Sequence, residues 1–156
     1  MEGLKKVDGD RVIYDRIRAG RPVLGVCVGE QIMFEHGLEH GAHAAGIGLI
    51  GGSVNLLDAT WCLTWMGHDR GRPRFGAAQR RGERTVLLRA LLRAMEVKPA
   101  DTSRFDIDLS DSPERVSWCS YGRSRFVAAY EHGPLSVTQF HPEKSGDAGS
   151  QLLKNW

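Results

Sequence analysis

The apolar positions near the start of the chain predict a helix over residues 9–18. Ile13 and Ile17 are spaced by about one helical turn and therefore share one face of this segment. Aspartates on either side of its first residue can cap the N-terminus, and Gly20 ends the helix on the other side. One face of this helix is therefore expected to pack on the core.

A buried strand and a second helix are predicted next. Residues 23–27 form an uncharged apolar run directly after Pro22, which is typical of a strand covered on both faces. The segment 31–36 then has a helical pattern that ends at Gly37. A helix, a buried strand and a helix in succession favour a layered α/β fold.

The second half of the regular pattern is richer in strands. Residues 46–57 predict two short strands around a glycine pair. Two apolar runs, 125–130 and 135–140, are separated by Glu-His-Gly-Pro, which predicts a β-hairpin. A last helix is expected over 149–156, with a serine or an aspartate shortly before it as its cap.

Length and composition indicate a single globular domain over residues 1–156. The mass is 17.3 kDa, 41% of the residues are hydrophobic and 26% are charged, which excludes a disordered or collagen-like chain. No segment has the pattern of a signal peptide or a membrane span. Three cysteines without metal-ligand spacing favour a reduced, cytoplasmic setting, and we expect no metal and no cofactor.

The net charge of +2 hides a basic block in the middle of the chain. Residues 61–93 contain eight arginines against only Asp69 and Glu83. The wider segment 61–116 shows neither strand alternation nor capped helices, although 85–97 can be drawn as a basic amphipathic helix. Such a block can bind nucleic acid, but it has few aromatic residues and no known module pattern, so this interpretation is the weakest one.

A candidate nucleophile follows the predicted strand. Cys27 is flanked two residues away on each side by Gly25 and Gly29, and small residues at these places permit a sharp turn from strand to helix. The N-terminus of a helix favours a thiolate, and the N–H of Val28 is placed to donate to an oxyanion. The alternative is a cysteine simply buried in a strand.

A candidate base with its orienting acid lies near the other end of the chain. In the sequence Gln-Phe-His-Pro-Glu, His141 and Glu143 point to the same side if the strand continues. A carboxylate beside an imidazole fixes its tautomer and stabilises its cation. The alternative is a solvent-facing pair, but together with Cys27 the pattern is that of a Cys-His-Glu triad.

These motifs resemble those of class I glutamine amidotransferases, whose hallmarks are G-x-C-x-G-x-Q and a later H-P-E. Within that class the chain is similar to the glutaminase subunits of imidazole glycerol phosphate synthases, which act in histidine biosynthesis. The similarity rests on PVLGVCVGEQIMFE at 22–35, on 46–57, and on RFVAAYEHGPLSVTQFHPEKSGDAGSQLLKNW at 125–156. It implies a class I amidotransferase-like (flavodoxin-like) α/β fold with a mostly parallel central sheet, incomplete in this chain.

The resemblance also implies roles for single residues. Cys27 would attack the amide carbon of glutamine, His141 would act as general base and acid, and Glu143 would orient it. Gln31 would contact the bound glutamine, with Val28 and Gly29 beside it as part of the binding site. Ammonia would pass to a cyclase partner, which is a (β/α)8 barrel, in a heterodimer.

Three departures from the family pattern stand out. Glu30 replaces a frequent methionine, which we expect to add a charge beside the glutamine site. A first strand and a glycine-rich loop that precede Met1 in the family are expected to be missing. The segment of about 61–115 lacks the family's Pro-His-Met-Gly-Trp and Tyr-Phe-Val-His-Ser-Tyr motifs, and synonymous codons for 85–94 shifted by one base encode Tyr-Phe-Val-His. We therefore hypothesise that part of this segment is translated out of frame.

The sequence leaves alternative functions open. The chain can be an inactive remnant that keeps the triad residues and serves as an interaction subunit, or the glutaminase of another class I amidotransferase. A metal site at His36, His40 and His43 is a third idea, but glycines interrupt the helix that would align them, which favours surface histidines.

Overall fold

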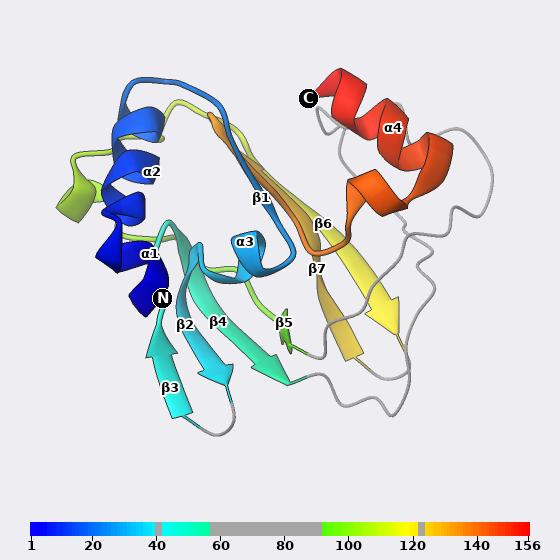
Figure 1. Cartoon of the computed structure of the whole chain (residues 1–156), viewed down its shortest axis with the longest axis horizontal. Helices are drawn as coiled ribbons and strands as arrows, with labels where there is room; N and C mark the ends of the chain where they lie inside the picture. Colours follow the sequence, from blue (N-terminus) through cyan, green and yellow to red (C-terminus); the bar gives the residue numbers. More distant parts are fainter. Residues whose placement is uncertain (40–41, 57–91, 122–123) are drawn as a thin grey trace.

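The computed structural model describes residues 1–39, 42–56, 92–121 and 124–156, and Figure 1 shows their arrangement. The α-helices among these residues are α1 (Glu2–Lys6), α2 (Gly9–Arg18), α3 (Val28–Gln31) and α4 (Gly146–Asn155). The strands are β1 (Val23–Val26), β2 (Phe34–Glu39), β3 (Ala42–Ala45), β4 (Ile50–Leu56), β5 (Leu92–Ala94), β6 (Glu114–Tyr121), β7 (Ser124–His132) and β8 (Leu135–Thr138). Short 3₁₀ turns occur at Ser103–Phe105 and Pro142–Lys144. None of the described helices is long and apolar enough to cross a membrane.

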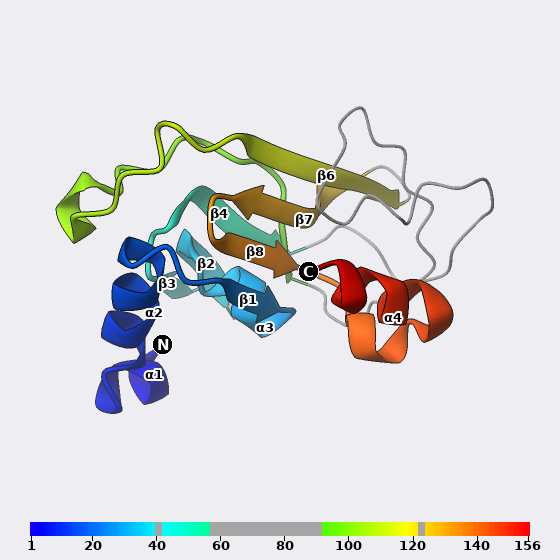
Figure 2. The same cartoon turned by 90° about the horizontal axis from the view of Figure 1, so that it is seen from above.

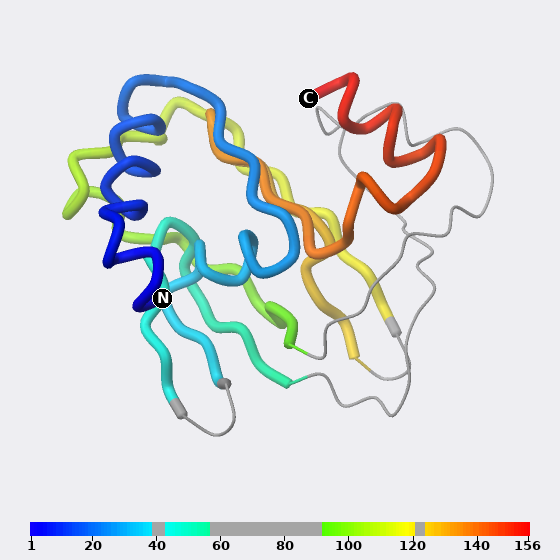
Figure 3. The backbone as a smooth tube through the Cα atoms, viewed as in Figure 1, coloured from blue at the N-terminus to red at the C-terminus, as the bar shows by residue number. Residues whose placement is uncertain are grey.

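The first sheet has the strand order β1-β8-β7-β6 and carries both ends of the candidate triad. β1 runs parallel to β8, with Val26 opposite Thr138, and Figure 3 shows the two segments side by side before the chain turns away into α3 and α4. β7 and β8 form the predicted hairpin. Gly133 adopts φ +56° in its turn, a conformation that glycine takes without steric cost.

The second sheet has the order β3-β2-β4-β5 and is also mixed. The α/β class is confirmed, but the expectation of a mostly parallel sheet is wrong for the described strands. Among their pairings only β1 with β8 and β2 with β4 are parallel. Only two residues of sequence separate β6 from β7, and two separate β7 from β8, so these pairs are antiparallel neighbours, since parallel neighbours need a long crossover.

Buried apolar side chains from both sheets form one core. The cluster includes Phe34 of β2, Ile50 of β4 and Val137 of β8, each without solvent exposure, and Ile17 of α2 packs into it. A second cluster joins Leu152 of α4 to the first sheet. In Figure 2, α1 and α2 lie at one end of the strands and α4 lies at the other.

The local predictions hold best where sequence signals are strong. Helix α2 has the predicted bounds, although Asp8 caps it without a side-chain hydrogen bond. Helix α4 begins at Gly146, earlier than predicted, and the Ser145 hydroxyl donates to the His141 carbonyl at 2.6 Å instead of capping the helix. Ser145 therefore helps to hold His141, the candidate base, in place.

The helix predicted over 31–36 is wrong. Helix α3 ends at Gln31, and Phe34 begins strand β2, because that segment pairs with β3 on one side and β4 on the other. The described part of the segment 46–57, which ends at residue 56, contains one strand, β4, rather than the two predicted. Pairing with distant strands outweighs the helical spacing of apolar residues here.

The middle of the chain is described only in part. Residues 92–94 of the predicted helix 85–97 form β5 and pair with β4, so that part of the prediction is wrong. The rest of that helix and most of the arginine-rich block lie outside the described residues.

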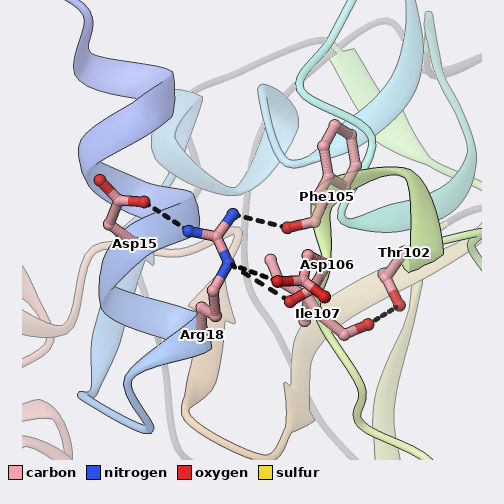
Figure 4. A network of polar contacts seen from close by, with 6 residues as sticks. All are labelled: Asp15, Arg18, Thr102, Phe105, Asp106 and Ile107. Carbon is pink, nitrogen blue, oxygen red and sulfur yellow. Dashed lines mark hydrogen bonds and ion pairs between the residues drawn. The ribbon is translucent and has the colours of Figure 1, made fainter.

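Arg18 ties helix α2 to the segment around Phe105, as Figure 4 shows. Its guanidinium donates to Asp15 Oδ1 at 2.6 Å, to the Phe105 carbonyl at 2.7 Å and to the Asp106 carbonyl at 3.3 Å. Tyr14, on the same helix, stacks on Phe105 with ring centroids 4.2 Å apart. These contacts fix the helix that precedes β1.

Candidate active site

Cys27 lies in a sharp turn between β1 and α3. Its backbone has φ 56° and ψ −107°, a conformation that a residue with a Cβ rarely adopts. Its N–H donates to the Thr138 carbonyl at 2.7 Å, which ties the turn to the end of β8. The side chain is half-buried rather than enclosed in the strand. The alternative of a cysteine buried in a strand is therefore wrong.

Gly25 makes this turn possible. A Cβ on Gly25 would lie 2.7 Å from the Gly29 carbonyl oxygen and 3.0 Å from Val137 Cγ1. A Cβ on Gly29 would meet nothing within 4 Å among the described residues. Close packing therefore requires a glycine at position 25. Gly29 contributes the backbone atoms against which Gly25 packs.

The start of α3 offers backbone donors next to the nucleophile. Within the described part of the chain, the N–H groups of Val28 and Gly29 have no hydrogen-bond acceptor, as is usual in the first turn of a helix. The Val28 side chain points into solvent, with 62% of its surface exposed. The Val28 N–H directly follows Cys27 and remains available to an oxygen atom bound at the turn.

His141 and Glu143 form the predicted pair. His141 Nδ1 lies 2.7 Å from Glu143 Oε1, and the two side chains are 26% and 51% exposed. Burial works to raise the pKa of Glu143, but hydrogen bonds from the backbone and from His141 outweigh it and lower the pKa below its ordinary value. An ionised Glu143 holds the proton of the imidazole on Nδ1, which leaves Nε2 to accept another.

The parallel pairing of β1 and β8 brings these groups to one edge of the sheet. Cys27 follows the last residue of β1, and His141 lies shortly after the end of β8. Because the carboxyl ends of neighbouring parallel strands lie at the same edge, residues from opposite ends of the chain converge there. No hydrogen bond joins Cys27 Sγ to His141 among the described residues.

Gln31 lies beside this edge, in contact with residues for which the sequence predicts no role. Its amide nitrogen donates to the Leu92 carbonyl at 3.0 Å and to Gln139 Oε1 at 3.1 Å. The Gln139 amide nitrogen in turn lies 3.8 Å from Cys27 Sγ. The sequence offers one signal for Gln139: a long polar residue between an apolar strand and the candidate base.

Glu30 does not add a charge at the surface of this site. The side chain is only 1% exposed, and burial raises the pKa of Glu30 well above its ordinary value despite the opposing field of Arg93. Burial therefore works against the charge that the sequence led us to expect beside Cys27, because it favours the neutral form of the carboxyl group.

Other candidate sites lie elsewhere or lack support. Among the described residues, no group of three or more His, Cys, Asp or Glu side chains can hold a metal ion; His36 and His43 lie on β2 and β3, and His40 is outside the described residues. A cavity of about 110 Å³ lies apart from the triad residues and is lined by Leu49, Pro99, Ala100, Thr102, Glu114, Tyr130 and His132. Its Tyr130 hydroxyl already donates to Glu114 Oε1 at 2.9 Å.

The sequence matches the family described as glutamine amidotransferase class-I over residues 3–156. The chain belongs to the class I glutamine amidotransferase family. It is 80% identical, over 159 aligned residues, to imidazole glycerol phosphate synthase subunit HisH of Bifidobacterium longum, covering all of this chain and 73% of that protein. It is 45% identical to the HisH subunit of Corynebacterium diphtheriae, again over all of this chain and 72% of the relative.

A solved structure supports the amidotransferase fold independently of sequence. The crystal structure of a protein from Thermoplasma acidophilum, described as a GMP synthase subunit, matches with a TM-score of 0.58 at 18% identity, over 97% of this chain and 63% of that one. At this identity the likeness concerns the fold alone. The assignment to the amidotransferase family and to glutamine hydrolysis rests on the family match and on the HisH relatives.

Proposed function

We propose that this chain is the glutaminase subunit of an imidazole glycerol phosphate synthase and that Cys27, His141 and Glu143 hydrolyse glutamine. The observation that carries the proposal is the strained turn at Cys27 on the same sheet edge as the 2.7 Å pair of His141 and Glu143. The similarity to HisH subunits supports the choice of synthase among class I amidotransferases.

The chemistry assigns one step to each group. His141 Nε2 takes the thiol proton as the sulfur of Cys27 attacks the amide carbon of glutamine, and the Val28 N–H donates to the oxyanion. His141 then gives this proton to the departing ammonia, and a glutamyl thioester remains. Water, activated by the same imidazole, hydrolyses the thioester to glutamate and restores the thiol. Glu143 stabilises the imidazolium in both halves of the reaction.

The partner in this proposal is a cyclase subunit with a (β/α)8 barrel that consumes the ammonia. Ammonia released into solvent would be lost to the cyclase reaction. The two proteins therefore act as a heterodimer, in which ammonia passes directly from one to the other. Gln31 and Gly29 complete the glutamine site in the first turn of α3.

The decisive experiment measures glutamate release by the full chain together with its cyclase subunit. Cys27→Ala is expected to abolish release, while Cys119→Ala, a matched change at a buried cysteine of β6, leaves it intact. Equal rates for wild type and Cys27→Ala would contradict the proposal. No release by the wild type with the cyclase present would instead favour an inactive subunit that only binds its partner.

A further inference from the structure

Glu30 is an unusual residue to find behind a nucleophile. It lies in α3, three residues after Cys27, and its carboxyl group is almost completely buried. Its Oε1 has no hydrogen-bond partner among the described atoms. An apolar side chain of similar length would fill this space without the cost of desolvating a carboxyl group and leaving one of its oxygens unsatisfied. The unfavourable burial of the Glu30 carboxyl group therefore indicates a function for it.

Among the described residues, a polar contact to the sulfur of Cys27 runs from Glu30 through Gln139. Glu30 Oε2 lies 3.2 Å from the end of the Gln139 amide, and the opposite end of that amide lies 3.8 Å from Cys27 Sγ. Gln139 is itself only 1% exposed, so its amide is enclosed between these two groups and the amide of Gln31. We propose that Glu30 is a positioning residue for the glutaminase reaction, which holds the Gln139 side-chain amide against the sulfur of Cys27.

Two orientations of the Gln139 amide place different atoms at the sulfur. With its oxygen toward Glu30, this oxygen accepts from Gln31 Nε2 at 3.1 Å and the Gln139 nitrogen donates to Cys27 Sγ. Turned over, the nitrogen would donate to Glu30 Oε2 and to the Leu92 carbonyl, both at 3.2 Å, and the oxygen would face the sulfur. Only the first orientation offers a hydrogen-bond donor to a thiolate.

The amide donor of Gln31 and the protonation of Glu30 together select between these orientations. A neutral carboxyl group can donate to the Gln139 oxygen, whereas a carboxylate can only accept from its nitrogen. Burial raises the pKa of Glu30, and Arg93 of the neighbouring β5 opposes this shift as the charged group that acts on it. Gln31 Nε2 donates to the Leu92 carbonyl at 3.0 Å and favours the Gln139 oxygen as its second acceptor, at 3.1 Å. That oxygen also lies 3.2 Å from Glu30 Oε2 and from the Leu92 carbonyl oxygen, so a proton on Glu30 completes the orientation in which Gln139 donates to the nucleophile.

This inference rests on the proposed role of Cys27, but its test does not require turnover. The rate at which iodoacetamide alkylates Cys27 at neutral pH is measured on the full chain, with mass spectrometry separating the Cys27 peptide from those of the other cysteines. Glu30→Met keeps the length of the side chain and removes its polar atoms. We expect it to slow the alkylation about tenfold, the effect of losing one hydrogen bond that is worth about 1.4 kcal/mol. Glu30→Gln can still donate to Gln139 and is expected to restore the rate to within about twofold of wild type.

Control variants separate this role from a general effect on folding. Glu35→Gln changes an acid on β2 that accepts from the Gly52 N–H at 3.3 Å, and it should not alter the alkylation rate. Gln139→Met should slow alkylation as much as Glu30→Met does, and the double variant should be no slower than either, because both remove one interaction. Gln139→Met also keeps the test valid if Glu30→Met fails to fold.

The outcomes are distinct for the two proposals. Wild-type alkylation rates in Glu30→Met and Gln139→Met, or a Glu30→Gln variant as slow as Glu30→Met, would overturn the role of Glu30. In the complex with the cyclase, Glu30→Met should lower kcat and leave KM unchanged, since the residue acts on the sulfur and not on bound glutamine. If the wild-type complex released no glutamate while alkylation still depended on Glu30, the proposed function would fail and the positioning role would stand.

Discussion

Replacing Gly25 by alanine tests whether the chain must pass close to itself just before the nucleophile. The new Cβ would lie 2.7 Å from the carbonyl oxygen and 2.9 Å from the carbonyl carbon of Gly29, well inside the ~3.5–4.0 Å at which carbon atoms pack. Val137, at 3.0 Å, is fully buried and has little room to move away. The backbone at the start of α3 must therefore shift.

The expected cost follows from these contacts. Forcing extra atoms into a packed site costs about 1–3 kcal/mol of stability. Gly29→Ala provides the matched control, because its Cβ meets nothing within 4 Å among the described residues and because alanine in a helix is favoured over glycine by about 0.5–1 kcal/mol. The two glycines flank the same cysteine, yet their variants should shift stability in opposite directions.

The assay is urea unfolding of both variants, followed by circular dichroism. Gly25→Ala should unfold at a lower urea concentration than wild type, and Gly29→Ala at an equal or higher one, with similar slopes of free energy against urea. A displacement of Cys27 by the shifted backbone should also slow its alkylation in Gly25→Ala. A Gly25→Ala protein as stable as Gly29→Ala would refute the close approach on which this account of the turn depends.

Four further predictions concern other parts of the molecule. Glu143→Gln should lower kcat/KM for glutamate release about 10²–10⁴-fold without moving the urea midpoint, since the half-exposed carboxylate acts on the imidazole. Glu30→Gln should match wild-type stability near pH 4 and exceed it increasingly as pH rises. The reason is that the pKa of Glu30 is raised in the folded state, so the wild type loses stability as this carboxyl group ionises. A difference in stability between the two proteins that does not vary with pH would contradict this. Tyr14→Phe should cost about 1 kcal/mol in thermal unfolding by removing the 2.7 Å bond to the Ile47 carbonyl. Sequencing the gene should show a shifted reading frame within the codons for 61–115, and an unshifted frame would refute that hypothesis.

Local signals in the sequence were sufficient for part of the fold. Helix α2 and the hairpin of β7 and β8 were predictable because each is determined by apolar spacing and by glycine nearby. Strand β2 was not, because Phe34 and its neighbours have the spacing of a helix and become a strand only by pairing with β3 and β4. Helix α3 is short because the residues that follow it form this strand instead of continuing the helix.

The candidate site shows the same division between local and long-range information. Cys27, His141 and Glu143 could be found because their motifs carry the chemistry in short stretches of sequence. The contact of Glu30 with Gln139 could not, since burial of a carboxyl group is decided by residues that are remote in the chain. From the sequence, Glu30 suggested an added charge, and only its enclosure, which favours the neutral carboxyl group, argues against that interpretation.

The register of β1 on β8 explains why these remote residues belong to one site. With Val26 opposite Thr138, the residues that follow each strand are brought together, so Gln139 must lie next to Cys27. A slip of one residue would turn the side chains of β8 to the opposite face of the sheet and remove Gln139 from the sulfur. The apolar side chains of the hairpin, above all the fully buried Val137, oppose such a slip. The packing of the core and the geometry at the nucleophile are therefore determined by the same strand pairing.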